Sequence, residues 1–262
     1  MSNDLDLIEE AACEVGDLAI QLREEGLQIW SKEGGTPVTN ADLRVDQLLR
    51  ERLGAARPDY GWLSEETADD PARLEHRRLF VVDPIDGTVA YMKNRPWWTV
   101  ALCVVDRDRP LAAVVHAPAL GETFAAVAGE GATLNGQPIQ ASDVDTLDDA
   151  SVLADAALLE GPGWAEPWPA MRLERRNSIA YRMALVGAGG FDAAIALGHK
   201  WDWDVAAGGL IACEGGAIVS DHAGRPHRFN QPIPRQASLV CAAPALHPLI
   251  ISRCAPIPLG DA

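Results

Sequence analysis

The segment Val81–Thr88, VVDPIDGT, carries the residues most suited to chemistry. One aspartate ends a short apolar run, and a second follows three residues later, directly before Gly-Thr. Two carboxylates and the Ile85 carbonyl aimed at one point would form the all-oxygen environment that Mg²⁺ prefers. The backbone N–H groups of Gly87 and Thr88, before a predicted helix over 89–93, would favour an anion. The segment predicts a metal site beside a phosphate site, with an Asp-Pro turn before an aspartate-capped helix as the alternative.

Three other acidic positions are ambiguous when each is taken alone. Glu65 and Glu66 follow an apolar pair, which is typical of a helix start, and Asp42 lies in the first turn of a predicted helix. Asp204, flanked by tryptophan and valine, either caps a helix or needs a cation as its partner. Four carboxylates brought together without cations would repel one another and raise at least one pKa. If the fold brings these acids together, the set makes sense as a metal cage; taken singly, each is more simply explained as a helix-start or capping acid.

Hydrophobic spacing predicts the elements that position these residues. The 31–37 segment lacks periodicity and is expected to be an exposed mobile loop. Helices are predicted over about 4–22, 40–53, 89–93, 179–186, 204–214 and 247–253, and strands over 78–83, 99–105, 111–116, 122–128, 217–220 and 238–242. The first half therefore consists of two helices followed by a meander of strands, and the second half alternates helices and strands.

Composition limits the class of protein. The 262 residues contain 38 acidic and 22 basic side chains, which gives a formal charge of −16. Such an acidic chain is not expected to bind nucleic acid, because phosphate backbones recruit basic surfaces. A hydrophobic content of 48% and a mean hydropathy of −0.04 are typical of a globular protein. We expect a single catalytic unit over 1–262, with approximate halves at 1–145 and 146–262.

Several other classes of protein are excluded. The first ten residues carry four acids and no basic run, and no apolar stretch is long enough to span a membrane, so a cytoplasmic protein without membrane contact is expected. Five cysteines without a CxxC pair indicate reduced thiols. Six histidines lack zinc-site spacing. The 187–190 segment, GAGG, has no preceding strand and is interpreted as a helix end, which argues against ATP-driven and serine-hydrolase chemistry.

Taken in order, the motifs resemble the inositol monophosphatase family of metal-dependent, lithium-sensitive phosphatases. The matching segments are the Glu65-Glu66 pair, DPIDGT at 83–88, WDVAAG at 203–208, PVTNAD at 37–42 and LNGQPI at 134–139. They cover nearly the whole chain. The resemblance implies an α/β fold with layers in the order αβαβα, of the inositol monophosphatase and fructose-1,6-bisphosphatase type, and a site between the halves.

The resemblance also implies roles for individual residues. The expected ligands of two or three Mg²⁺ ions are Glu65, Asp83, the Ile85 carbonyl, Asp86 and Asp204, whereas Asp202 lies outside the motif. Asp42 and Thr88 match the pair that orients the attacking water, and Glu66 is expected to join them as a catalytic residue. Lys32 matches the lysine of a loop that closes over the site. The expected substrate-binding residues are Gly87, Thr88, Ser178 and Lys32. Li⁺ inhibition and a homodimer are also implied.

Two features favour a nucleotide as the substrate. Animal inositol-hydrolysing relatives place a glutamate seven residues before the metal-binding Trp-Asp aspartate, and this chain has Leu197 there. The 32–39 segment, KEGGTPVT, resembles the loop of bacterial 3'(2'),5'-bisphosphate nucleotidases. We therefore expect removal of the 3'-phosphate from adenosine 3',5'-bisphosphate, a small phosphomonoester. The alternatives are an inositol-1-monophosphatase and a non-catalytic protein that binds a partner.

The residues that would bind the rest of a nucleotide are not identified by the sequence. Candidates for the second phosphate, by charge alone, are Arg176, Arg182, Lys200 and Arg225, each also explained as a surface cation. Tryptophans could stack an adenine at positions 97, 98, 201 and 203. The first two are better explained as core or subunit-interface residues.

Overall fold

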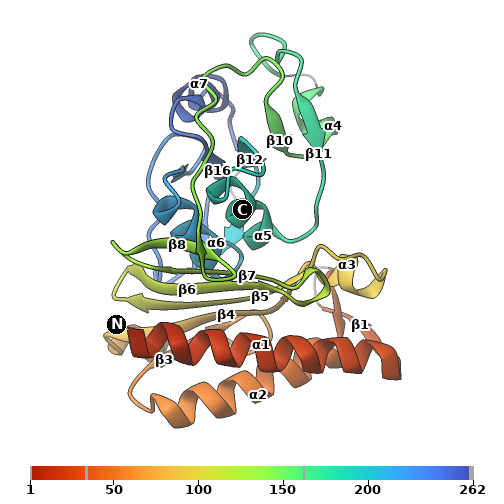
Figure 1. The fold of residues 1–262 in the computed structure, drawn as a ribbon, viewed down its shortest axis with the longest axis vertical. Coiled ribbons are helices and arrows are strands. Elements are labelled where there is room, and N and C mark those ends of the chain that lie inside the picture. The colour runs from red at the N-terminus through yellow and green to blue at the C-terminus, as the bar shows by residue number, and fades with distance from the viewer. Residues whose placement is uncertain (1, 33–34, 162, 260–262) are drawn as a thin grey trace.

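The computed structural model describes residues 2–32, 35–161 and 163–259, and Figure 1 shows its helices and sheets stacked in layers. None of the helices within these ranges combines the length and the apolar character needed to cross a membrane.

Two long helices, α1 (Ser2–Glu25) and α2 (Asn40–Ala56), cover one face of a seven-stranded sheet (Figure 1). Helix α1 buries Ile8, Ala12, Val15 and Ala19, whose spacing of three or four residues places them on one face. The sheet is antiparallel except where β3 pairs with β4. Its strands, in spatial order, are β3 (Gly61–Ser64), β4 (Arg78–Asp86), β5 (Thr99–Asp106), β6 (Arg109–Ala117), β7 (Glu122–Val127), β8 (Gly131–Leu134) and β9 (Gln137–Pro138).

The central strands of this sheet are apolar on both faces because both faces are covered. In β5, Leu102 and its alternate neighbours pack in the cluster with α1 and α2, whereas Cys103 and its alternate neighbours pack in the cluster with α5 and α6. Successive side chains of a strand point to opposite faces, so a continuous apolar run predicts a strand buried on both sides.

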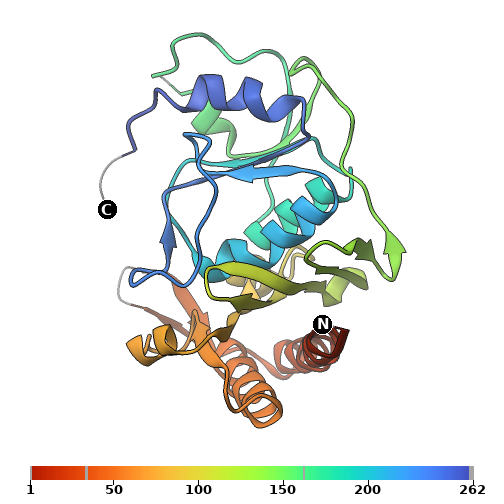
Figure 2. The same cartoon turned by 90° about the vertical axis from the view of Figure 1, so that its left-hand side faces the viewer.

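Helices α5 (Ile179–Gly187) and α6 (Asp202–Glu214) form the middle layer, and Figures 1 and 2 both show them between the two large sheets. The two helices approach each other closely at Gly208, where a Cβ would lie 2.6 Å from the carbonyl oxygen of Ala180. The glycine and alanine run of α6 is therefore required by packing. A helix that is apolar all round is typical of a fully enclosed layer.

The second sheet has five strands, covered on its outer face by α4 (Ala156–Leu159) and α7 (Leu246–Cys254). Its spatial order is β11 (Arg172–Glu174), β10 (Ser151–Leu153), β12 (Ala193–Ala196), β16 (Leu239–Ala242) and β14 (Ile218–Ser220). The layers therefore follow the predicted order αβαβα, and the predicted fold class is confirmed. The chain crosses between the sheets over 139–150. The division into halves at 145 lies in this crossing and stays a prediction.

Short elements differ most from the sequence-based expectation. The 31–37 segment, expected as a loop, is flanked by β1 (Ile29–Ser31) and β2 (Pro37–Thr39), which pair as a hairpin; Glu33 and Gly34 lie outside the described residues. No helix begins at Glu65, because β3 ends at Ser64 and bends follow. Helix α6 begins at Asp202, two residues before the predicted start. Strands β10, β11 and β12 were not predicted, since strands of three or four residues depend on their neighbours for stability.

Candidate active site

The last residues of β4 carry both Asp83 and Asp86, where the sequence predicted a tight turn after Asp83. Strand β4 extends to Asp86, three residues beyond the predicted end, and its pairing with β5 is irregular between the two aspartates. Gly87 then adopts φ 95° and precedes the short helix α3 (Thr88–Met92). Both aspartates are buried. The irregular end of β4 therefore holds two buried carboxylates, and the Ser178 and Ala180 donors to Asp86 show that it lies against the start of α5.

Gly87 is required between β4 and α3 for two reasons. Its φ lies in the left-handed region, and a Cβ would meet the carbonyl oxygen of Trp97 at 3.0 Å and the backbone nitrogen of Ser178 at 3.1 Å. A Gly87→Ala protein is expected to lose about 2–3 kcal/mol of unfolding free energy, measured by urea denaturation, because backbone strain and contact act together.

Gly121→Ala is the matched control for this prediction. Gly121 also has a positive φ, 63°, but a Cβ there would meet no atom within 4 Å. Strain alone should cost about 1 kcal/mol and leave activity unchanged. Equal losses in the two variants would contradict the role given to the contacts around Gly87.

Asp42 is fixed at the start of α2 and meets Thr88. Its Oδ2 accepts hydrogen bonds from the Thr39 backbone nitrogen at 2.8 Å and from Thr39 Oγ1 at 2.6 Å. In return, the Asp42 backbone nitrogen donates to Thr39 Oγ1 at 3.4 Å, which completes a capping box, so the predicted first-turn position is confirmed. Asp42 Oδ1 lies 3.2 Å from Thr88 Oγ1, which is also 3.2 Å from the carbonyl oxygen of Ile85. The predicted pair is therefore in contact, although its residues are 46 positions apart.

Ser178 holds the Asp86 carboxylate by a hydrogen bond. Its hydroxyl donates to Asp86 Oδ2 at 2.6 Å, and the backbone nitrogen of Ala180 donates to the same oxygen at 2.7 Å. Ser178 also caps α5 by accepting from the Tyr181 backbone nitrogen at 2.9 Å. Its side chain is fully buried and holds Asp86, and its predicted contact with substrate stays a prediction.

Lys32 joins the β1–β2 hairpin to the Glu65-Glu66 pair. Its Nζ lies 2.8 Å from Glu65 Oε1 and 2.7 Å from Glu66 Oε1. Burial raises the pKa of Glu66 to about 7, and the neighbouring Lys32 opposes that shift. Sequence reasoning missed Asp46 of α2, which accepts hydrogen bonds from Ser64 and Thr67 and so anchors the segment that carries the pair. The hairpin therefore reaches the carboxylates, as the predicted role of Lys32 requires.

Asp83 is buried and Asp204 is half-buried, and the pKa values of both carboxyl groups are raised. Burial raises the pKa of Asp204 to about 8, and the Asp86 carboxylate adds to the shift. Burial also raises the pKa of Asp83, reinforced by Glu65, Asp86 and Asp204. Within the described residues, Asp83 Oδ1 is buried without a hydrogen-bond partner. The Trp201 backbone nitrogen donates to Asp204 Oδ2 at 2.8 Å, so the buried oxygen of this pair that needs a partner is Asp83 Oδ1.

Asp202, two residues from Asp204, does not line the pocket that contains the other carboxylates. Its two oxygens accept from the Asn230 backbone nitrogen at 2.8 Å and from Gln236 Nε2 at 2.7 Å. Of these two aspartates in the first turn of α6, only Asp204 lines the pocket of carboxylates.

One pocket of about 290 Å³ collects the predicted residues Glu65, Asp83, Asp86, Gly87, Thr88 and Asp204 in its lining. Asn177, Thr36 and Ile179, which the sequence did not single out, also line it, together with Lys200. Burial lowers the pKa of Lys200, although Asp204 acts in the opposite direction. In the part of the chain that the structure describes, no three acidic, histidine or cysteine side chains form a preformed metal cage. Lys32 at Glu65 and Ser178 at Asp86 hold two of the carboxylates in other interactions.

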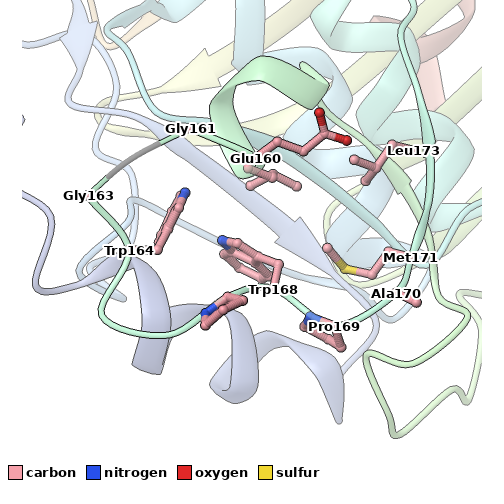
Figure 3. Close-up of a pocket in the computed structure, with 11 residues that line it drawn as sticks. Glu160, Gly161, Gly163, Trp164, Trp168, Pro169, Ala170, Met171 and Leu173 are labelled. Carbon is pink, nitrogen blue, oxygen red and sulfur yellow. The ribbon is translucent and has the colours of Figure 1, made fainter.

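A larger cavity of about 700 Å³ lies apart from these carboxylates. Figure 3 shows its lining, where Trp164, Trp168 and Met171 surround an open space beside Glu160. No residue of the carboxylate pocket contributes to it. The acidic pocket is therefore the smaller of the two, and its chemistry rather than its size identifies it as the site.

The structure reduces the number of residues that could bind the adenine and the second phosphate of a nucleotide. The guanidinium group of Arg176 lies over the rings of Trp97, Tyr181 and Phe191 and interacts with that aromatic cluster. Arg225 is exposed in a turn. Trp98 is fully buried in the cluster with α1 and α2, as expected of a core residue, and Trp97 packs against the cluster with α5 and α6. Trp201 and Trp203 stack on each other with centroids 5.1 Å apart. Arg182 and Lys200 remain as cations close to the pocket.

The model of the family described as "Inositol monophosphatase family" matches residues 2–258. A 3'(2'),5'-bisphosphate nucleotidase CysQ from Aggregatibacter actinomycetemcomitans is 31% identical, over 85% of this chain and 86% of that protein. A histidinol-phosphatase from Chlorobaculum parvum is also 31% identical, over 86% and 88%. The Nus factor SuhB of Escherichia coli is 29% identical, over 84% and 85%. The structure of a Thermotoga maritima IMPase superposes with a TM-score of 0.82 at 25% identity, covering 95% and 96% of the two chains.

Proposed function

Because the chain belongs to the inositol monophosphatase family, whose members are phosphatases and are generally Mg²⁺-dependent, we propose that the acidic pocket binds Mg²⁺ and hydrolyses a phosphate monoester. The proposed ligands are the side chains of Glu65, Asp83, Asp86 and Asp204 and the carbonyl of Ile85. The observation that carries the proposal is the convergence of these carboxylates on one pocket beside Asp42 and Thr88.

The chemistry of the donor set fits Mg²⁺. All of the proposed ligands are oxygens, which hard cations prefer. Asp83 Oδ1 is buried without a protein donor, and the pKa values of Asp83, Asp86 and Asp204 are all raised, first by burial. A cation would satisfy the orphaned oxygen and favour the ionised forms. When bound, Mg²⁺ would neutralise phosphate charge, lower the pKa of a water and stabilise the leaving oxygen.

Asp42 and Thr88 are suited to orienting the attacking water. Thr88 Oγ1 has one proton, which it can donate to Asp42 Oδ1, leaving its lone pairs to accept a hydrogen bond from water. Thr39 fixes the other oxygen of Asp42, so the Asp42 acceptor for the Thr88 hydroxyl is held in place before substrate binds. The backbone N–H groups of Gly87 and Thr88 would bind phosphate oxygens. Glu66 and Lys32 would act from the hairpin side, with the ammonium moving between the glutamates and the phosphate.

The substrate that we favour is adenosine 3',5'-bisphosphate, from which the 3'-phosphate would be removed. The 31% identity with a bisphosphate nucleotidase and the KEGGTPVT segment support this choice. Leu197 supports it too, because it gives the neighbouring cavity an apolar wall where an inositol ring would need a polar partner. Inositol 1-phosphate is the second candidate, since the matched family is the inositol monophosphatase family.

Phosphate release tests the choice directly. Adenosine 3',5'-bisphosphate, inositol 1-phosphate and histidinol phosphate would be compared by kcat/KM with Mg²⁺ and with EDTA. The bisphosphate should be hydrolysed at least tenfold faster, and EDTA should abolish the reaction. Faster hydrolysis of inositol 1-phosphate or histidinol phosphate would contradict the proposed substrate but not the proposed phosphatase activity. Failure with every monoester would overturn catalysis and favour a protein that acts by binding a partner.

Three finer properties belong to the same proposal. We expect two or three Mg²⁺ ions per chain, which isothermal titration would count. We expect Li⁺ to inhibit phosphate release. We expect a homodimer, which sedimentation equilibrium would detect.

A further inference from the structure

A second cavity, of about 510 Å³, adjoins the acidic pocket. It lies between α4, α5, β12 and β13 (Lys200–Trp201), and it shares Ile179 and Lys200 with the acidic pocket. Its volume is within the range typical of small-molecule sites. A molecule whose reacting phosphate lay among the carboxylates could therefore extend past Lys200 into this cavity.

More basic than acidic side chains line this cavity, whereas the whole protein has a net negative charge. Arg175, Arg182 and Lys200 line it, and Asp155 is its one acid in the part of the chain that the structure describes. Asp155 lies 3.6 Å from Arg175, so that pair is largely neutral, which leaves Arg182 and Lys200. In a chain of formal charge −16, two such cations beside an acidic site are a specific feature. They would attract an anionic group.

Both cations retain donors for a ligand. Nε and Nη2 of Arg182 donate to the carbonyl oxygen of Arg176, which fixes the guanidinium and leaves Nη1. Lys200 Nζ donates to the carbonyl oxygens of His199 at 2.9 Å and Gly198 at 3.4 Å, which leaves one of its three N–H groups. Arg182 is therefore held in place, and Lys200 stands between the two cavities.

The remaining wall is apolar, with Leu197 and Ile195 beside Ile179. We propose that Lys200 and Arg182 bind the second, non-reacting phosphate of a bisphosphorylated substrate, with Leu197 packing against the group that joins the two phosphates. This inference rests on the proposed function and assigns residues to the specificity of that site. It selects two of the four cations that the sequence offered by charge alone.

Lys200→Gln tests the inference through the ratio of the kcat/KM values for two substrates. The ratio of kcat/KM for adenosine 3',5'-bisphosphate to that for adenosine 3'-monophosphate should exceed ten in the wild type. It should fall about tenfold in Lys200→Gln, equivalent to about 1.4 kcal/mol. Circular dichroism checks that the variant is folded, and the ratio removes any loss of activity that is common to both substrates. Lys200→Arg should restore most of the ratio, because it restores the charge.

Lys93→Gln is the matched control, since Lys93 is an exposed lysine outside both cavities. Its ratio should equal that of the wild type. If the wild type prefers the bisphosphate and Lys200→Gln keeps the full preference, the inference is overturned and the proposed function stands. If the wild type hydrolyses both nucleotides equally, the second phosphate is not recognised and the inference is overturned too. If it hydrolyses monophosphates but not the bisphosphate, the proposed substrate is wrong, and the inference with it.

Discussion

Replacing Asp83 with asparagine is expected to lower kcat/KM for phosphate release by about 10³-fold, which corresponds to about 4 kcal/mol of transition-state stabilisation. Asp83 is buried, its Oδ1 is without a hydrogen-bond partner within the described residues, and it is proposed to bind Mg²⁺. The substitution removes the charge and keeps the size of the side chain. Steady-state phosphate release at saturating Mg²⁺ measures the loss.

The same substitution should have the opposite effect on stability in EDTA. Burial and the neighbouring carboxylates raise the pKa of Asp83, so its ionised form destabilises the folded state near neutral pH. A neutral amide relieves this repulsion, and Tm should rise by a few degrees. A loss of activity together with a lower Tm would show that Asp83 is only structural and would contradict the proposed role.

Asp202→Asn is the matched control for Asp83→Asn. Asp202 is also buried, but its oxygens face Asn230 and Gln236 rather than the pocket. The activity of its folded fraction should stay within about threefold of the wild type. An equally large loss of activity in this variant would mean that removing any buried charge from this region inactivates the protein.

The sequence predicted the parts of the fold whose patterns are long. The apolar face of α1 repeats along a helix of 24 residues. Strands β4 and β5 are apolar at successive positions because side chains on both faces of the sheet are buried. The carboxylates of the site were also predicted, because each lies directly at the end of such an element. Asp83 and Asp86 end β4, Asp42 starts α2 and Asp204 lies in the first turn of α6.

The remaining features depend on contacts between distant segments. The β1–β2 hairpin has three-residue strands, and nothing in its sequence shows that Lys32 reaches a glutamate 33 residues away. Ser178 occupied the predicted position, yet the burial that makes it a partner of Asp86 comes from the packing of α5 against β5. The second cavity is formed by residues from four elements of the second half, none of which carries a motif.

In EDTA, the protein is expected to lose stability as the pH rises from 5 to 8. Burial raises the pKa of Asp86 to about 6, that of Glu66 to about 7 and that of Asp204 to about 8. In this range the folded state binds more protons than the unfolded state, in which these acids are ionised, so the free energy of unfolding falls as the pH rises. The expected loss is at least about 3 kcal/mol, which lowers Tm by at least about 6–12 °C, measured by circular dichroism.

Mg²⁺ should reverse this loss, and more strongly at pH 8 than at pH 5, because a cation binds ionised carboxylates. At about 100 times its Kd, Mg²⁺ should add about 2.7 kcal/mol at pH 8. Asp204→Asn should flatten the pH dependence in EDTA. Asp148→Asn, which removes an exposed acid and changes the net charge equally, should not. Equal effects of Mg²⁺ at both pH values, at matched ionic strength, would show that it acts by general screening and not through the buried carboxylates.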